Sequence, residues 1–337
     1  MGLDDLAAVD AATLGTGLPP AHARAAWATA IDGARRVDLG RTLPGTPPRT
    51  VVIVASANVF TAPIEWAWAL GGRGVRVILK SARGLAAVGE ALARTLPHVE
   101  AHDWRGGDLD AEAAALAGCD AVMVFGTTET IAAIRARSPA PVLGFGPRFG
   151  VAVLPDLEAP VAAGIAEDHA LYDGRGCMSP AGVFVPPGPM GPLLDALETC
   201  DVRLPAGSIE PADAQARRTL ATLASAVGRA HTVGSWLVVE LPGAHFRPRG
   251  LPRTVCVYPR AALAPAVRPF ADELGTVALV GVEEGDVRRH PALAAELGLD
   301  LDHPARVCAV GRAQHPPGDR ALHDGADVLA ALWAAGA

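Results

Sequence analysis

Short apolar runs rich in β-branched residues alternate with longer amphipathic segments from residue 49 onward. In the first half of the chain, we predict strands at residues 50–55, 75–79, 99–103, 120–125 and 141–145. The run at 50–55 is nearly all apolar, which is typical of a strand buried on both faces. Helices are predicted between these strands, at 63–70, 84–96, 109–117 and 130–136. Strands that alternate with helices form a parallel, doubly wound sheet, whose ligands bind at the carboxyl ends of strands.

The second half of the chain continues this α/β alternation. We predict helices at 160–171, 193–200, 211–229, 291–297 and 326–335. Strands are predicted at 183–185, 233–240, 253–258, 276–282 and 306–310, with a long turn at 243–252. Residues 1–48 hold a predicted helix at 21–34 and a proline-rich breaker. The pattern therefore predicts an N-terminal helical segment (1–48), two α/β domains (49–150 and 151–310) and a C-terminal segment (311–337).

Composition and charge narrow the class of protein. Half of the 337 residues are apolar, and the formal net charge is −7 without a cluster of basic residues, which argues against a nucleic-acid surface. The N-terminus is acidic and no uncharged apolar run reaches membrane-spanning length, so we expect neither a signal peptide nor a membrane partner. The five cysteines are odd in number and widely spaced, which favours a reduced, cytoplasmic setting and no metal site.

Polar residues follow three of the predicted strands in the first half. Asn58 can donate a side-chain N–H to a developing oxyanion, although an Asx turn or a helix N-cap is the simpler explanation of this residue taken alone. Lys80 can contact a phosphate or a ribose hydroxyl, or be a solvated lysine at a strand end. Arg83 can add a contact to a 2′-phosphate, or be a surface charge. Residues 126–129 open a helix whose free N–H groups suit a phosphate; a threonine cap is the alternative.

A single cysteine, Cys177, lies in a glycine-rich stretch between a predicted helix and a predicted strand. Glycines let a backbone approach a substrate closely, and a cysteine in such a loop can be a thiolate nucleophile. The alternative is a small core residue. His169 can pair with this thiol, but an exposed helix face is the simpler interpretation. His323 and Asp324 can form a base with its carboxylate, or a turn that caps the last helix.

Taken in order, these pieces resemble the aldehyde dehydrogenase superfamily. They most resemble its acyl-CoA reductase branch, which includes the fatty-acid reductase of bacterial bioluminescence. The turn at Asn58 resembles the asparagine loop of the superfamily, and residues 77–81 resemble the strand whose lysine contacts the cofactor ribose. Residues 125–129 resemble the turn at the nicotinamide and pyrophosphate, and residues 174–180 resemble the loop of the nucleophilic cysteine.

Further motifs carry the same resemblance to the end of the chain. Residues 144–148 resemble the segment that joins the two domains. The motifs at 274–278, 310–312 and 322–325 are the more specific to the reductase branch. The resemblance implies an aldehyde dehydrogenase-like fold, with a nicotinamide cofactor-binding domain at 49–150 and a catalytic domain at 151–310.

Two departures from the superfamily pattern matter. Gly144 occupies the position where most aldehyde dehydrogenases have a glutamate that activates the hydrolytic water. Its absence disfavours oxidation of an aldehyde to an acid and suits exchange of the acyl group with a thiol. The chain is also shorter than family members usually are, mainly before residue 49, where elements of the cofactor domain or an oligomerisation arm are expected.

The resemblance implies reduction of an acyl thioester, carried by CoA or an acyl-carrier protein, to an aldehyde through a cysteine acyl-enzyme. NADPH is the expected cofactor, with NADH a possible one, and a homo-oligomer is possible. The implied catalytic residues are Cys177 and Asn58. The implied cofactor-binding residues are Lys80, Ser81, Arg83, Gly126 and Thr127. The alternatives are an acyl-phosphate reductase of the same superfamily, a non-catalytic scaffold or carrier-binding subunit, and an oxidising aldehyde dehydrogenase.

Overall fold

The computed structural model describes residues 2–316, 322–323 and 326–335. The chain forms two compact units, Met1–Pro147 together with His315–Ala337, and Arg148–Gln314. The N-terminal segment and most of the C-terminal stretch therefore belong to the first unit, whereas the sequence analysis set them apart. Each unit is described by itself below.

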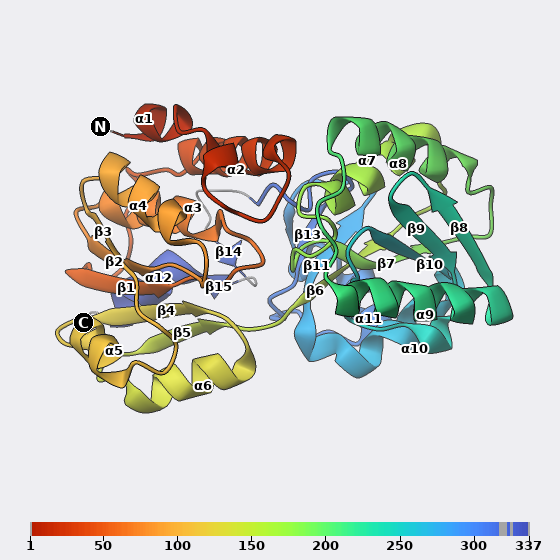
Figure 1. Cartoon of the computed structure of the whole chain (residues 1–337). Helices are drawn as coiled ribbons and strands as arrows, with labels where there is room; N and C mark the ends of the chain where they lie inside the picture. The colour runs from red at the N-terminus through yellow and green to blue at the C-terminus, as the bar shows by residue number, and fades with distance from the viewer. Residues whose placement is uncertain (1, 317–321, 324–325, 336–337) are drawn as a thin grey trace. The chain divides into compact units, whose positions relative to one another are not determined.

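The first unit is built on a parallel sheet of five strands in the order β3-β2-β1-β4-β5 (Figure 1). The strands are β1 (Thr50–Val54), β2 (Arg76–Lys80), β3 (Val99–His102), β4 (Ala121–Phe125) and β5 (Val142–Phe145). The connecting helices are α3 (Ala62–Gly71), α4 (Ala86–Thr95), α5 (Leu109–Leu116) and α6 (Thr128–Arg137). Each matches a predicted element to within a few residues, so the prediction of a doubly wound parallel sheet is confirmed.

Helices cover both faces of this sheet, with α3 and α4 on one side and α5 and α6 on the other (Figure 1). The side chains of Val52 and Val54 in β1 pack with Leu116 of α5 and with Ile131 of α6. Alternate residues of a strand face opposite sides of the sheet. Because both faces are covered, β1 can be apolar at nearly every position, which explains the continuous run in the sequence.

The N-terminal helices support the turn that follows β1. Helices α1 (Leu3–Ala7) and α2 (Pro20–Arg35) are joined through Trp27, whose indole N–H donates to the Leu6 carbonyl at 3.0 Å. The Trp27 ring also stacks on Phe60, with ring centroids 6.3 Å apart. Phe60 is buried two residues after Asn58. The stacking therefore anchors the Asn58 turn to the N-terminal helices.

The C-terminal stretch completes the first unit. It contains the paired strands β14 (Leu322–His323) and β15 (Ala326–Asp327), and helix α12 (Val328–Ala335). Arg41 forms an ion pair with Asp327, which ties the N-terminal segment to this stretch. Among the described residues, no helix has both the length and the apolar character needed to cross a membrane.

The second unit contains an eight-stranded sheet in the order β12-β13-β11-β6-β7-β10-β9-β8. Its strands are β6 (Phe149–Val153), β7 (Pro180–Val185), β8 (Arg229–Val233), β9 (Trp236–Glu240), β10 (Thr254–Pro259), β11 (Leu274–Leu279), β12 (Gly285–Asp286) and β13 (Arg306–Ala309). Its helices are α7 (Ala159–Ala170), α8 (Gly191–Arg203), α9 (Pro211–Val227), α10 (Leu263–Val267) and α11 (Pro291–Leu297). The central strands β13, β11, β6, β7, β10 and β9 run parallel.

An aromatic cluster fills one side of this sheet. Phe246 lies 5.6–5.7 Å, between ring centroids, from Phe149, Phe184 and Tyr258. All four side chains are buried. Phe246 belongs to the long segment between β9 and β10, so that segment is fixed to the core and not a loose surface turn. Contacts at these distances between tilted rings are favourable beyond the area they bury.

One predicted element is wrong. The single strand predicted at 233–240 is the second half of an antiparallel hairpin, β8–β9, and the preceding helix ends at Val227. Gly234, at φ 51°, makes the turn, and a Cβ built there would lie 2.3 Å from an Asp201 carboxylate oxygen. The Ser235 N–H donates to that carboxylate at 2.9 Å. This contact between α8 and the hairpin turn is not visible in the local hydrophobic pattern.

Candidate functional site

In the first unit, the predicted cofactor residues gather at the carboxyl edge of the sheet. Val54, at the end of β1, pairs with Lys80 of β2 and with Val124 of β4. The Asn58 turn, Lys80 and the Gly126 turn therefore leave three adjacent strands at the same edge. This is the place where ligands of doubly wound sheets bind.

Asn58 does not cap the helix that follows it. Helix α3 begins at Ala62, and its N-cap residue is Thr61, whose side chain makes no capping hydrogen bond. Asn58 is exposed, and its side chain makes no hydrogen bond to another residue that the structure describes. The helix-cap interpretation of Asn58 is therefore wrong, and its amide is not engaged in local structure.

Lys80 is the only lysine in the sequence, against 28 arginines within the total of 29 basic residues. Its ammonium group donates to the Ser81 carbonyl at 3.1 Å and lies 5.8 Å from the ring centroid of Trp104. Burial lowers the pKa of Lys80, and the nearby charge of Arg83 acts in the same direction, although two carboxylates oppose it. An anion bound here would therefore relieve an electrostatic cost.

The residues that follow Lys80 have different surroundings. Ser81 is 5% exposed, and a Cβ built on Gly89 of α4 would lie 2.3 Å from the Ser81 hydroxyl oxygen. The Ser81 side chain thus packs under α4 and only its carbonyl faces Lys80. Arg83 is exposed in the connection to α4. The structure brings the charges of Lys80 and Arg83 together and leaves the Ser81 hydroxyl apart.

The Gly126 turn leads into the N-terminus of α6. Thr127 is the N-cap residue, and its hydroxyl accepts from the Thr130 N–H at 3.3 Å. The predicted alternative of a threonine cap with Glu129 in the first turn is thus confirmed. The Gly126 N–H donates to the Phe145 carbonyl at 3.2 Å. Thr127 remains exposed, so the positive end of the helix dipole is open at the same edge as Lys80.

In the second unit, Cys177 lies in the loop between α7 and β7 and is half-buried. Burial raises the pKa values of the other four thiols, those of Cys119 and Cys200, that of Cys256 to about 11 and that of Cys308 to about 12. Those thiols are protonated near neutral pH and are poor nucleophiles. Cys177 is therefore the candidate nucleophile among the five.

His169 is not the partner of Cys177. Its Nδ1 lies 2.8 Å from the Ile165 carbonyl oxygen, and its Nε2 lies 3.0 Å from the Pro180 carbonyl oxygen. The ring is 1% exposed and its burial lowers its pKa. Both predicted interpretations, an exposed helix residue and a thiol partner, are wrong. His169 instead joins the end of α7 to the first residue of β7, across the base of the Cys177 loop.

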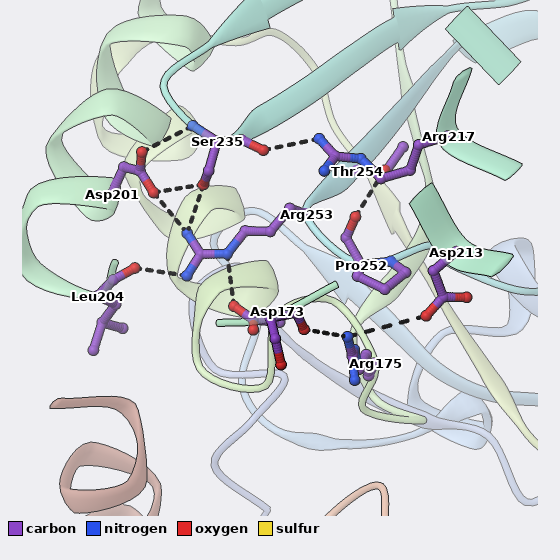
Figure 2. Close-up of polar contacts among 11 residues, drawn as sticks. Asp173, Arg175, Asp201, Leu204, Asp213, Arg217, Ser235, Pro252, Arg253 and Thr254 are labelled. Atoms are coloured by element: carbon purple, nitrogen blue, oxygen red, sulfur yellow. Dashed lines mark hydrogen bonds and ion pairs between the residues drawn. The ribbon is translucent and has the colours of Figure 1, made fainter. Parts of the chain in front are cut away.

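Arg253, whose side chain is completely buried, holds the amino-terminal half of the Cys177 loop through the polar contacts drawn in Figure 2. The guanidinium Nε donates to an Asp173 carboxylate oxygen at 2.6 Å, and the Arg253 N–H donates to the Asp173 carbonyl at 2.9 Å. Nη1 donates to Asp201 at 2.9 Å, and Nη2 donates to the Leu204 carbonyl at 2.7 Å. The guanidinium carbon lies 4.6 Å from the Trp236 ring centroid, a cation–π contact.

Asp173 and Arg253 also share an unusual backbone conformation. They are the two non-glycine residues with positive φ among the described part of the chain, at 56° and 49°. Such conformations cost free energy and persist where the surroundings enforce them, which is often at functional sites. Sequence analysis missed this pair, because Arg253 was taken only as the first residue of a strand after an arginine- and proline-rich turn.

The remaining predicted pair cannot be placed in full. His323 ends β14, whereas Asp324 and Gly325 lie outside the described residues. Among the residues that are described, no group of three or more His, Cys, Asp or Glu side chains is arranged to hold a metal ion.

Comparison with protein families shows the family to which this chain belongs. The family described as acyl-CoA reductase (LuxC) matches residues 82–335. The chain belongs to this family. Its enzyme class is therefore an oxidoreductase that acts on the aldehyde group. No curated protein matches the chain in a sequence search.

Solved structures of aldehyde dehydrogenases share the fold of this acyl-CoA reductase family member. NADP-dependent glyceraldehyde-3-phosphate dehydrogenase from Bacillus halodurans C-125, complexed with NADP, is 18% identical with a TM-score of 0.62, and the match covers 88% of this chain and 74% of that one. A lactaldehyde dehydrogenase is 15% identical with a TM-score of 0.63, over 92% and 76%. A mutant of aldehyde dehydrogenase C from Pseudomonas syringae, complexed with NAD⁺ and octanal, is 14% identical with a TM-score of 0.62, over 89% and 71%. The predicted aldehyde dehydrogenase-like fold is confirmed.

Gly144, at the position where the resemblance places a glutamate in most aldehyde dehydrogenases, packs closely against α6. A Cβ built on Gly144 would lie 2.4 Å from a methyl carbon of Ile131 in α6. No side chain fits at this position unless α6 or the Ile131 side chain shifts. Close packing against Ile131 therefore favours glycine at position 144.

The buried Arg253 network generates a stability prediction. Arg253→Met keeps the length of the side chain and removes the guanidinium that the carboxylates of Asp173 and Asp201 bind. Removing one partner of a buried ion pair costs about 3–5 kcal/mol, so we expect the free energy of unfolding in urea to fall by that amount. Arg288→Met is the control, since Arg288 pairs with Asp286 at the surface and exposed pairs contribute little. Equal unfolding midpoints for Arg253→Met and wild type would show that the network does not stabilise the loop.

Proposed function

We propose that this protein reduces an acyl thioester to an aldehyde with a nicotinamide cofactor, through an acyl-enzyme on Cys177. The observation that carries the proposal is the half-buried Cys177 thiol in a loop held by a buried ion pair, while burial raises the pKa values of the other four thiols. Membership in the acyl-CoA reductase (LuxC) family supports the thioester as substrate.

In the proposed reaction, the Cys177 thiolate attacks the thioester carbonyl carbon and forms a tetrahedral oxyanion. The oxyanion collapses, the carbon–sulfur bond to the carrier breaks, and the carrier thiolate leaves and takes up a proton. The Cys177 acyl-enzyme then accepts a hydride at the carbonyl carbon and a proton at its oxygen, giving a thiohemiacetal. Loss of the Cys177 thiolate from that carbon, with release of the hydroxyl proton, yields the aldehyde.

The oxyanion needs hydrogen-bond donors, and two are proposed from the family resemblance. One is the backbone N–H of Cys177, and the other is the side-chain amide of Asn58. The exposed and locally unengaged Asn58 side chain supports this role. Loss of one such donor typically lowers the rate by about 100-fold or more.

Features of the carboxyl edge of the first sheet support a nicotinamide dinucleotide as the ligand proposed there. Lys80 and Arg83 offer two cations for the adenosine end, and the open N-terminus of α6 at Gly126 and Thr127 suits the pyrophosphate. Ser81 contributes through its backbone, since its hydroxyl packs under α4. The bound cofactor would supply the hydride. Structural relatives are described as NADP-dependent or as complexed with NADP or NAD⁺, and Arg83 favours NADPH over NADH.

The thioester mechanism predicts that the leaving group is released as a free thiol. With an acyl-CoA series and NADPH, we expect free thiol to appear in equal amount to the NADPH oxidised, and we expect Cys177→Ala to abolish both. A thiol-reactive chromogen and the absorbance of NADPH measure the two together. Cys256→Ala is the matched control, because burial raises the pKa of that thiol to about 11, and it should leave the rate nearly unchanged.

Two other outcomes distinguish the alternatives. Turnover of an acyl phosphate, with release of phosphate and no requirement for a thiol, would show that the substrate is an acyl phosphate and not a thioester. Failure to bind NADPH or NADH, measured by quenching of tryptophan fluorescence, would contradict an enzymatic function and favour a scaffold or carrier-binding subunit.

Lys80 generates a prediction about cofactor affinity. Lys80→Met should weaken NADPH binding about 10-fold or more, because one charge-assisted contact to a phosphate or ribose is lost. Arg76→Met on the same strand, whose exposed side chain pairs with Glu100, should change affinity little. Fluorescence titration measures both dissociation constants. Equal affinity of Lys80→Met and wild type would remove Lys80 from the cofactor site.

The pKa of Lys80 gives this prediction a pH dependence. Burial lowers that pKa in the free protein, and a bound anion raises it, so the cofactor binds the protonated form more tightly. Wild-type affinity should therefore fall as the pH rises through the pKa of free Lys80, and this fall should be absent in Lys80→Met.

A further inference from the structure

The carboxy-terminal half of the Cys177 loop has a second anchor, Gln314. Its amide nitrogen donates to the Ser179 hydroxyl at 2.9 Å and to the Asp168 carbonyl at 2.8 Å. Gln314 is 4% exposed and Ser179 is 5% exposed. One amide group thus links the end of α7 to the last residue of the loop, two positions after Cys177.

The amide oxygen of Gln314 is buried and has no hydrogen-bond partner among the described residues. It lies 3.4 Å from a Cβ built on Gly176, the residue before Cys177. The amide cannot be turned over, because its oxygen would then face the Asp168 carbonyl oxygen. A buried acceptor without a donor is costly and rare, and here it lies against the nucleophile loop.

The segment that carries Gln314 is itself fixed to α7. The Asp168 carboxylate accepts from the Gly311 N–H and from the Ala313 N–H, both at 2.8 Å. A Cβ built on Gly164 of α7 would lie 2.6 Å from the Val310 side chain, so only glycine permits this close approach. Residues 310–314 therefore run along α7 in a single register.

Arg306 connects the same segment to the loop by a separate route. Its guanidinium donates to the Ala313 carbonyl at 2.7 Å and to the Arg312 carbonyl at 2.9 Å. It also contacts the Met178 sulfur, at 3.7 Å. Met178 contacts Arg306, which binds residues 312 and 313, and Ser179 accepts from Gln314. The two residues after Cys177 are thus both tied to residues 312–314.

We propose that Gln314 is a positioning residue for Cys177 and acts through Ser179. This proposal rests on the proposed function, in which Cys177 is the nucleophile. The amide holds the loop backbone so that the thiolate and the Cys177 N–H keep the orientation that acylation requires. Misplacement of a reacting group by about 1 Å can lower a rate about 100-fold. Gln314 is the last residue of the second unit along the chain, so the end of this unit is held to the nucleophile loop.

The test is a double-mutant cycle on the rate of acylation. Ser179→Ala, Gln314→Ala and the double variant are mixed rapidly with an acyl-CoA in the absence of NADPH, and the Cys177 adduct is followed by intact mass. Each single variant should slow acylation about 10-fold, and the double variant should be no slower than either, because both remove one shared contact. Gln215→Ala, at an exposed position of α9 where the side chain contacts Arg218, should match wild type.

Alkylation by iodoacetamide tests the proposal without any acyl substrate. Gln314→Met keeps the length of the side chain and removes the amide that donates to Ser179. A loop released from this contact exposes the half-buried thiol more, so the rate constant for alkylation of Cys177 should rise, and Ser179→Ala should raise it by a similar factor. Gln215→Met should leave that rate constant unchanged. If wild type forms no acyl adduct, the thioester proposal fails and the alkylation arm alone decides the role of Gln314.

Two results would overturn the positioning role. One is a double variant whose acylation is slowed by the product of the two single effects, or single variants whose acylation is not slowed at all. The other is an unchanged rate constant for alkylation of Cys177 in Gln314→Met accompanied by a lowered melting temperature, which is the behaviour of a residue that only stabilises the fold.

Discussion

The buried Arg253 guanidinium is the constraint on which the candidate nucleophile site depends. A buried charge must have its hydrogen-bond donors satisfied, and here the Asp173 carboxylate, together with the Asp201 carboxylate and the Leu204 carbonyl at the end of α8, accepts from the guanidinium. The ion pair fixes Asp173 and Arg253 in backbone conformations that non-glycine residues seldom adopt. The backbone at the start of the Cys177 loop is therefore fixed by both packing and charge. This fixed backbone holds the Cys177 thiol in its half-buried position.

The two units use opposite ends of their parallel strands. In the first unit, the cations and the open end of α6 gather where strands β1, β2 and β4 finish, a place suited to anions. In the second unit, the Cys177 loop leads into the amino end of β7, and Arg253 leads into the amino end of the neighbouring strand β10. No helix begins within residues 171–179, all of which the structure describes, so buried side chains fix the geometry of this loop.

The sequence predicted the repetitive parts of this molecule well, because they follow from local periodicity. The five strands of the first sheet, and the placement of Asn58, Lys80 and Gly126 at or just beyond strand ends, follow from hydrophobic alternation alone. What the sequence did not reveal depends on contacts between distant residues. Arg253 lies 80 positions from Asp173, and His169 is buried with its ring against the Pro180 carbonyl. The hairpin at Gly234 depends on Asp201 in another element.

The central claim is that Cys177 carries the acyl group. Incubation with an acyl-CoA in the absence of cofactor, followed by proteolysis and mass spectrometry, locates any acyl adduct on the chain. We predict an adduct on Cys177 alone, absent in Cys177→Ala, and discharged as aldehyde when NADPH is added. An adduct on another cysteine, or one on Cys177 that NADPH does not discharge, would contradict the claim.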